Sequence, residues 1–390
     1  MAAMEIIPIT DSKRLAAFCE SLGDADYIAV DTEFLRDRTY WPRLCLVQIA
    51  GPDEAAAIDT LAPDIDLQPL YDLMANQDVL KVFHAGRQDV EIFFHATGSI
   101  PEPLFDTQVA AMVCGFGDQV SYENLVAKLV GAATDKSSRF TDWAHRPLTQ
   151  KQLTYALADV IHLRPAYEAL AAQLEKSGRT HWLDQEMNIL MDRDTYRLEP
   201  ELAWRRLKSR NNSPRFHAIM RELAAWRETA AQTKDVPRNR ILRDDALLEI
   251  AAQAPTKKEA LERLRALPKG YANSAAGAEI IETVSRARNL PDSELPQLPK
   301  QKARQSGLGA VTDLLKVLLK HVTETQNVAP RLIASTDDLE MIAGDDNANV
   351  PALQGWRREI FGDDALALKR GEVALAIKGR KTRVVNLKTP

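Results

Sequence analysis

The chain has 390 residues, of which 45% are hydrophobic and 27% are charged, and its formal net charge at pH 7 is -5. Its length predicts about two to three domains, and its composition is that of a globular protein that buries a core. No apolar run is long enough to span a bilayer. The acidic balance argues against a protein that binds nucleic acid with its whole surface.

The N-terminal segment and the cysteines bear on location. Residues 1–8 lack the basic and long apolar regions of a signal peptide. Cys19, Cys45 and Cys114 are scattered, with no CxxC spacing. We therefore expect a reduced, cytoplasmic protein with neither a disulfide framework nor a zinc site.

Residues 1–195 have the pattern of a mixed α/β domain. Apolar runs predict strands at 27–34, 44–50, 55–59 and 79–84, the first three forming an antiparallel meander. Helical periodicity predicts helices at 12–22, 67–74, 85–94, 106–114, 122–130 and 149–174. Thr149 is the expected N-cap of the last and longest helix.

Strand signals disappear beyond about residue 200. The periodicity predicts one helical domain at 200–287 and another at 307–385, with breaks at Pro330 and Gly362 in the second. A proline-spaced segment, 288–306, is the expected linker. The two helical segments have similar lengths and each holds a tryptophan in a helix, which suggests a diverged tandem repeat.

Two carboxylates lie near the end of the first predicted strand. Apolar residues lead into Asp31 and Glu33, whose side chains point the same way because strand residues alternate between faces. Like charges on one face repel. A hard cation such as Mg²⁺ or Mn²⁺ would turn that repulsion into binding. Taken alone, the D-x-E pattern better fits a strand that runs into solvent with both carboxylates hydrated.

Three further residues extend this constellation. Asp89 lies at the start of the helix that follows the 79–84 strand, at the sheet edge where α/β sites are built. Tyr155 and Asp159 share one face of the long helix because they are four residues apart. Each aspartate considered separately fits a hydrated helix residue, and Tyr155 fits a core tyrosine.

Together these motifs resemble the tyrosine-containing subclass of the DEDD exonuclease superfamily, and within it the ribonuclease D family. The resembling stretches are 31–42, 84–89 and 135–148, which lead to Tyr155 and Asp159. Downstream, 203–208 and the helical segments resemble the helicase-and-RNase-D C-terminal (HRDC) domains. The resemblance implies an RNase H-like α/β exonuclease domain, a mixed sheet with flanking helices, followed by two all-α HRDC-like domains.

The resemblance also implies a catalytic apparatus. Asp31 would bridge two divalent ions, Mg²⁺ or Mn²⁺, that together activate water and neutralise phosphate charge. Glu33 and Asp159 would complete one metal site, and Asp89 would support the other through water. Tyr155 would orient the attacking water or help to deprotonate it, and its free pKa of about 10 favours orientation unless a metal lowers that pKa.

Substrate contacts are expected at aromatic and basic residues. Phe34 and Trp41 suit stacking on terminal bases, or else belong to the core. The other expected contacts are polar or cationic side chains, each of which also fits a packed or hydrated role: His84, Arg87, Lys136, Arg146, Arg205 and Arg206. Basic clusters at 205–210, 238–243 and 378–383 are possible electrostatic footprints of RNA.

The expected function is that of a metal-dependent 3′→5′ exoribonuclease releasing nucleoside 5′-monophosphates. The implied substrates are RNAs with a single-stranded 3′ end, such as tRNA precursors, and the expected oligomeric state is monomeric. One alternative is a 3′→5′ exonuclease that acts on DNA, because the same four carboxylates serve both and the residues that sense the 2′-hydroxyl are not evident. Another is a non-catalytic RNA-binding scaffold.

Overall fold

The computed structural model describes residues 6–133, 135, 137–139, 141–297 and 307–387. The chain forms two compact units. The first comprises the described residues of Met1–Glu33, Cys45–Thr195 and Lys302–Pro390, and the second those of Phe34–Leu44 and Tyr196–Gln301. Among the helices of these described residues, none has the length and hydropathy needed to cross a membrane.

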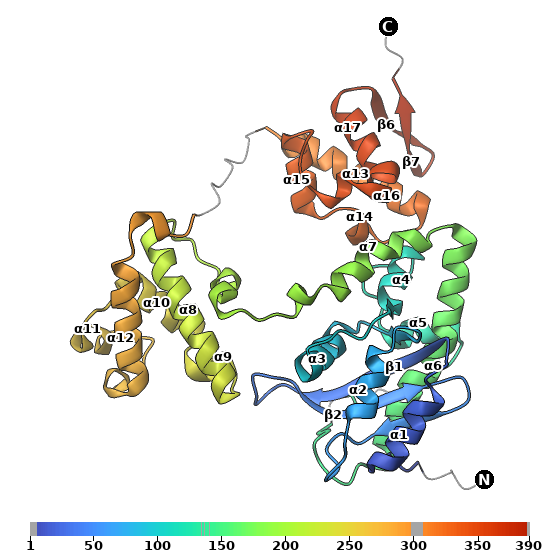
Figure 1. The fold of residues 1–390 in the computed structure, drawn as a ribbon. Coiled ribbons are helices and arrows are strands. Elements are labelled where there is room, and N and C mark those ends of the chain that lie inside the picture. Colours follow the sequence, from blue (N-terminus) through green and yellow to red (C-terminus); the bar gives the residue numbers. More distant parts are fainter. Residues whose placement is uncertain (1–5, 134, 136, 140, 298–306, 388–390) are drawn as a thin grey trace. The chain divides into compact units, whose positions relative to one another are not determined.

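A five-stranded mixed sheet forms the centre of the first unit, with strand order β3-β2-β1-β4-β5 (Figure 1). Its strands are β1 (Tyr27–Leu35), β2 (Arg43–Ala50), β3 (Ala55–Ile58), β4 (Leu80–Phe83) and β5 (Leu104–Asp106). β2 pairs antiparallel with β3, whereas β4 pairs parallel with both β1 and β5. The mixed sheet is thus confirmed. β5 was not predicted, because three residues are too few to show an alternation.

Seven α-helices of the described chain accompany this sheet: α1 (Ser12–Ser21), α2 (Gln68–Ala75), α3 (Arg87–Thr97), α4 (Thr107–Val113), α5 (Tyr122–Leu129), α6 (Gln150–Ser177) and α7 (Thr180–Met191). α6 begins with a capping box, in which the Thr149 hydroxyl accepts from the Gln152 N–H and the Gln152 side chain accepts in return. It ends at Gly178, whose φ of 67° is the left-handed conformation that glycine tolerates. α7 was not predicted.

α6 packs on the sheet and defines the face that carries the carboxylates. Val160 and Leu163 of α6 form one buried cluster with Ala29 of β1 and Val82 of β4. Side chains of a strand alternate, so Asp31 and Glu33 share the face of Ala29. Both carboxylates therefore lie on the face of β1 that α6 covers.

The second helical segment belongs to the first unit. Its helices are α13 (Gly309–Gln326), α14 (Pro330–Ile333), α15 (Thr336–Gly344), α16 (Gly355–Arg357), the π-helical turn η6 (Arg358–Gly362) and α17 (Asp363–Lys369). A hairpin of β6 (Val373–Lys378) and β7 (Lys381–Asn386) follows. The expectation of helix to residue 385, and of no strands beyond 200, is wrong here. Alanine and leucine suit a helix, but Gly379, with φ of 64°, turns the chain back on itself.

This segment is docked on α7. The rings of Trp182 and Trp356 stack with centroids 4.2 Å apart and planes 7° apart. The buried Arg357 guanidinium donates to Gln185 and pairs with Glu186. The burial of aromatic area together with a paired charge holds the segment to the α/β fold of the first unit.

The second unit is a helical domain joined by the loop that follows β1. Its helical elements are η2 (Pro200–Arg206), α8 (Pro214–Lys234), α9 (Arg238–Ile241), α10 (Asp244–Gln253), α11 (Lys258–Glu262), η3 (Tyr271–Asn273), α12 (Ala275–Arg288) and η4 (Asp292–Glu294). Leu223, Leu247 and Ile280 are fully buried at its centre. Of the expected linker, residues 298–306 lie outside the described part of the chain.

Tyr40 anchors the β1–β2 loop on this helical domain. Its ring is 6% exposed, and its hydroxyl donates to the buried Glu228 carboxylate and accepts from Arg238 at 2.9 Å. The Asp235 carboxylate accepts the backbone N–H groups of Tyr40 and Trp41, both at 3.0 Å. A loop that directly follows β1 in the chain is thus part of the core of the helical domain.

The two helical segments share an order of elements, which supports the tandem repeat. A long helix ends at a left-handed residue, Asp235 or Asn327, and a four-residue helix follows. A third helix comes next, followed in the first segment alone by the short helix α11. In both segments there is then a 3-10 turn whose carbonyl lies against a glycine of the last helical stretch, Gly277 or Gly362. A Cβ at either glycine would lie 2.6 Å from that carbonyl oxygen. The two tryptophans are not equivalent, since Trp226 lies in the long helix and Trp356 in α16.

We expect Arg357→Ala to lower the free energy of unfolding by about 2 kcal/mol, because it removes a buried guanidinium and leaves the partly exposed Glu186 carboxylate without its partner. The matched control is Arg358→Ala. Arg358 pairs with Asp363 at 2.9 Å, but its side chain is 55% exposed, so its loss should cost under about 1 kcal/mol. Urea denaturation followed by tryptophan fluorescence measures both. Equal losses would show that Arg357 does not hold the docked segment.

Candidate active site

Three carboxylates lie close together where α6 packs against β1. Asp31 and Glu33 come from β1 and Asp159 from α6, and one oxygen atom of each lies within 4.8 Å of the others. All three side chains are partly exposed, so the cluster is open to solvent. Hard oxygen donors at this spacing fit a cation such as Mg²⁺ or Mn²⁺.

The electrostatics of the cluster also fit a cation. Burial and the charge of Asp159 raise the pKa of Asp31 to about 8, and burial raises that of Asp159 to about 7. Burial and the neighbouring carboxylates raise the pKa of Glu33 further. Arg139 acts in the opposite direction on Glu33 and Asp159, lowering both pKa values. In the metal-free fold these three carboxyl groups keep their protons to a higher pH than free carboxyl groups do, because their charged forms are partly desolvated and repel one another.

Asp89 lies beside the cluster. It occupies the first turn of α3, is 7% exposed, and accepts a hydrogen bond from the Thr32 hydroxyl. Burial and the charge of Asp31 raise its pKa well above the usual range. Its oxygens are not among those that lie within 4.8 Å of one another. This placement is consistent with a supporting role, as the resemblance implied.

Tyr155 lies one helical turn before Asp159 and donates its hydroxyl hydrogen bond to that carboxylate. Burial and the three nearby carboxylates raise its pKa above its ordinary value. Its ring lies 6.1 Å from that of the buried Trp143. In the metal-free site the tyrosine keeps its proton, and in that state its hydroxyl can orient a water molecule.

Tyr122 was missed by the sequence analysis. Its hydroxyl donates to the backbone carbonyl of Asp159 and lies 3.2 Å from that of Ala158. The first residue of α5 thereby holds the turn of α6 that presents the Asp159 carboxylate. No local pattern predicts this contact, because it joins residues in two separate helices.

Arg146 is a structural residue, contrary to the expectation of a phosphate contact. Its guanidinium makes a bidentate pair with Asp59 at 2.6 and 2.7 Å. It also donates to the carbonyls of Trp143, His145 and Cys45 at 2.7–3.0 Å. All its donors are thus used to hold the segment before α6 against β2 and the end of β3.

Two other residues of the first unit were expected to contact substrate, and one is packed whereas the other is exposed. His84 Nδ1 lies 3.0 Å from the Thr107 hydroxyl, and burial lowers its pKa, so the ring is neutral. Its ring packs edge-on against Tyr122 at 5.6 Å. Arg87, the first residue of α3, is exposed. Lys136 lies outside the described residues.

The remaining expected contacts belong to the second unit. Phe34 and Trp41 are partly exposed, so neither is a core residue. Arg206 lies 3.7 Å from the buried Glu228, beside the Tyr40 anchor. Its guanidinium therefore compensates an internal charge.

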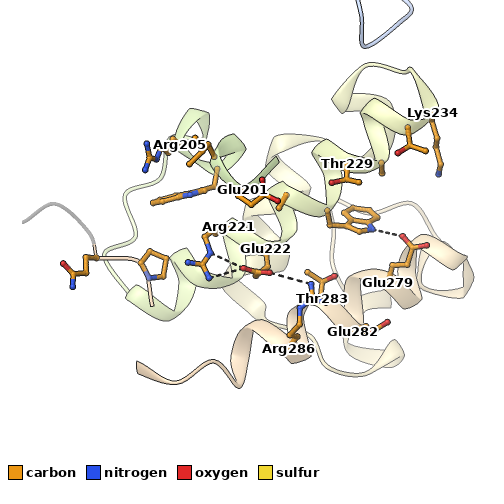
Figure 2. A pocket seen from close by; sticks show the side chains of 18 residues that line it. Glu201, Arg205, Arg221, Glu222, Thr229, Lys234, Glu279, Glu282, Thr283 and Arg286 are labelled. Atoms are coloured by element: carbon orange, nitrogen blue, oxygen red, sulfur yellow. Dashed lines mark hydrogen bonds and ion pairs between the residues drawn. The ribbon is translucent and has the colours of Figure 1, made fainter. Parts of the chain in front are cut away.

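Arg205 lines a groove of about 1120 Å³ formed by η2, α8 and α12 (Figure 2). Much of its charge is neutralised internally, because Arg221 and Arg286 both pair with Glu222, at 3.1 and 3.7 Å. The Trp226 indole donates to Glu279 at 2.7 Å. The groove offers aromatic and polar groups of both charges.

Comparison with protein families gives two matches. Residues 6–175 match a 3'-5' exonuclease family, and residues 216–284 match the HRDC domain. The first match contains all five expected catalytic residues and the second covers most of the helical domain of the second unit. The expected α/β exonuclease fold with an HRDC domain after it is confirmed.

Comparison with individual proteins extends over nearly the whole chain. Ribonuclease D of Granulibacter bethesdensis is 50% identical, over 97% of this chain and 96% of that protein. Ribonuclease D of Nitrobacter hamburgensis is 52% identical, over 96% of this chain and 98% of that protein. The crystal structure of Escherichia coli RNase D, described as an exoribonuclease involved in structured RNA processing, superposes with a TM-score of 0.81 at 31% identity. It covers 94% of this chain and 99% of that one. With a carboxylate cluster and a tyrosine on the matching fold, this chain belongs to the ribonuclease D family and is an enzyme of the 3′-5′ exonuclease class.

Proposed function

We propose that this chain is a divalent-metal-dependent 3′→5′ exoribonuclease that releases nucleoside 5′-monophosphates. The observation that carries the proposal is the cluster of Asp31, Glu33 and Asp159, whose oxygens lie within 4.8 Å of one another. Such a cluster can hold a cation between the central strand β1 and α6, next to the Tyr155 hydroxyl. Membership of the ribonuclease D family gives RNA as the substrate class.

Each residue has a role in this proposal. Asp31, Glu33 and Asp159 hold the metal, and Asp89 supports a second ion. Two Mg²⁺ or Mn²⁺ ions, when bound, supply an activated water and neutralise charge on the phosphate. The Tyr155 hydroxyl orients the water, and Tyr122 keeps α6 in place behind Asp159.

The proposed substrates are RNAs with a single-stranded 3′ end, including tRNA precursors and other stable RNAs. The structured-RNA role described for the Escherichia coli enzyme supports this choice. We further propose a monomer that acts in the cytoplasm, where its three free cysteines stay reduced. The proposed domains are an exonuclease domain at 1–195, HRDC-like domains at 200–287 and 307–385, and a linker at 288–306.

The direct test uses 5′-labelled single-stranded RNA and DNA of one sequence, with Mg²⁺, Mn²⁺ or chelator. We expect a metal-dependent ladder that shortens from the 3′ end of the RNA and is absent with Asp31→Ala. Asp53→Ala, at an exposed turn of the same unit, should cleave like the wild type. A ladder mainly on DNA would move the substrate to DNA. Intact binding without cleavage of either strand would favour a non-catalytic scaffold.

Asp159→Asn should lower the single-turnover rate of cleavage by on the order of 10³-fold or more while RNA affinity stays within about twofold. The amide keeps the shape of the side chain but removes a metal-binding charge. Glu175→Gln, an exposed isosteric change on the same helix, is the matched control. Cleavage at the wild-type rate by a homogeneous Asp159→Asn preparation would contradict the assigned role.

The stabilisation given by Mg²⁺ should grow with pH. The pKa values of Asp159 and Asp31, about 7 and about 8 in the folded protein, exceed those of aspartate in an unfolded chain, about 4. Retained protons therefore favour the metal-free fold fully below about pH 4, and this advantage disappears as pH rises through 7 to 8. Mg²⁺ replaces those protons.

Thermal unfolding at pH 6 and pH 9, with and without Mg²⁺, measures this effect. We expect the difference in Tm to be larger at pH 9, and Asp159→Asn to reduce it. An equal Mg²⁺ effect at both pH values would show that the cluster does not bind the metal in competition with protons.

A further inference from the structure

One face of the hairpin of β6 and β7 carries a cluster of positively charged side chains. Lys378 lies directly opposite Lys381, and Arg383 directly opposite Ala376. Cross-strand partners share a face, and residues two apart along a strand do too, so these three cations lie on one side of the ribbon. Arg380 is at the turn beside them.

The opposite face of the hairpin is the one that packs on the helices. Thr382, which alternates with Lys381 and Arg383 along β7, lies with its hydroxyl 3.2 Å from Nδ1 of His321 in α13. Val373, at the base of β6, is 7% exposed. The cationic face is therefore turned away from α13. Ile377 is 79% exposed, so the end of the hairpin extends beyond the helices that support its base.

The positive charge of this face is not compensated by nearby side chains. Lys378, Arg380, Lys381 and Arg383 are all exposed, and none makes a hydrogen bond or ion pair with another side chain in the described part of the chain. Glu372, the acidic residue just before β6, pairs with Arg370 at 2.6 Å. Opposed lysines repel, at a cost of a few tenths of a kcal/mol that a bound polyanion would remove.

The amino-acid composition of the hairpin fits double-helical RNA better than single-stranded RNA. Proteins that bind single strands stack bases on aromatic side chains, and no residue of β6 or β7 is aromatic. Double-helical RNA is instead recognised by its shape and by contacts to its phosphates and 2′-hydroxyls. A narrow ribbon with cations on one face suits contact with such a backbone.

We propose that the β6–β7 hairpin binds the phosphate backbone of double-helical RNA, in the stem that adjoins the single-stranded 3′ end. This inference rests on the proposed function, because it takes RNA as the substrate. It adds a separate site for the folded part of the substrate, carried by Lys378, Arg380, Lys381 and Arg383. The active site acts on the tail, and the hairpin binds the stem.

The test measures affinity in the presence of chelator, so that no cleavage occurs. One RNA has a stem with a 3′ tail, and the other is the tail alone. We expect Lys381→Gln with Arg383→Gln to weaken binding of the stem RNA about tenfold at low salt. The slope of log affinity against log salt concentration should also become shallower, by the amount expected for the loss of about one to two phosphate contacts. Binding of the tail alone should change less than about twofold, because it has no stem to contact.

Two matched variants separate position from charge. Lys13→Gln with Arg14→Gln removes the same charge from the exposed side of α1 and should leave both affinities unchanged. Lys381→Arg with Arg383→Lys keeps the charge of the hairpin and should bind the stem RNA like the wild type. Should the double variant unfold on heating below the wild-type Tm, Arg380→Gln at the turn replaces it, with an expected loss of about threefold.

Several outcomes would overturn the proposal. Unchanged stem affinity in the hairpin variant would do so, as would an equal loss for both RNAs or for the α1 control. A loss of binding to vesicles containing anionic lipid, with stem affinity intact, would assign the hairpin to a membrane surface instead. Failure of the proposed function is a separate result, namely an intact wild-type protein that shortens no RNA when Mg²⁺ or Mn²⁺ is present.

Discussion

Mutual repulsion among three closely spaced, partly exposed carboxylates is the constraint on which the site depends. Asp31, Glu33 and Asp159 are held together by a strand and a helix that pack through apolar contacts, not by charge compensation alone. The free energy that keeps them close is supplied by the core between α6 and the sheet, together with the capping box at Thr149 and the hydroxyl of Tyr122. A rigid scaffold is therefore a condition of metal binding, since a looser one would let the like charges separate.

The basic residues that the sequence offered as phosphate contacts have unequal roles. Arg146 has a geometry suited to phosphate, yet its donors are directed to Asp59 and to backbone carbonyls, because the segment before α6 needs a fixed position. Arg206 compensates the buried Glu228. Cations that meet a substrate must lack such internal partners, and in the described chain the exposed face of the β6–β7 hairpin meets that condition.

Much of the fold and of the site followed from local patterns. The 27–34 strand with its D-x-E ending, the N-cap at Thr149 and the four-residue spacing of Tyr155 and Asp159 are short-range features, and the structure places them as expected. What sequence reasoning missed depends on contacts between distant residues. The Tyr122 hydroxyl and the Arg146–Asp59 pair have no periodicity to reveal them. The hairpin was mistaken for helix because its alternating alanine and leucine residues are also good helix formers.

The Tyr40 anchor has a consequence for how such chains diverge. Tyr40 lies in a loop contiguous with β1, yet its hydroxyl and backbone are bound by Glu228, Arg238 and Asp235 of the helical domain. The helical domain is thus not an independent module that an ancestor could gain or lose without change elsewhere. A lineage that discarded it would expose the Tyr40 ring to solvent, so selection should shorten or replace the loop at the same time. Substitutions at these two sequence-distant places should be inherited together.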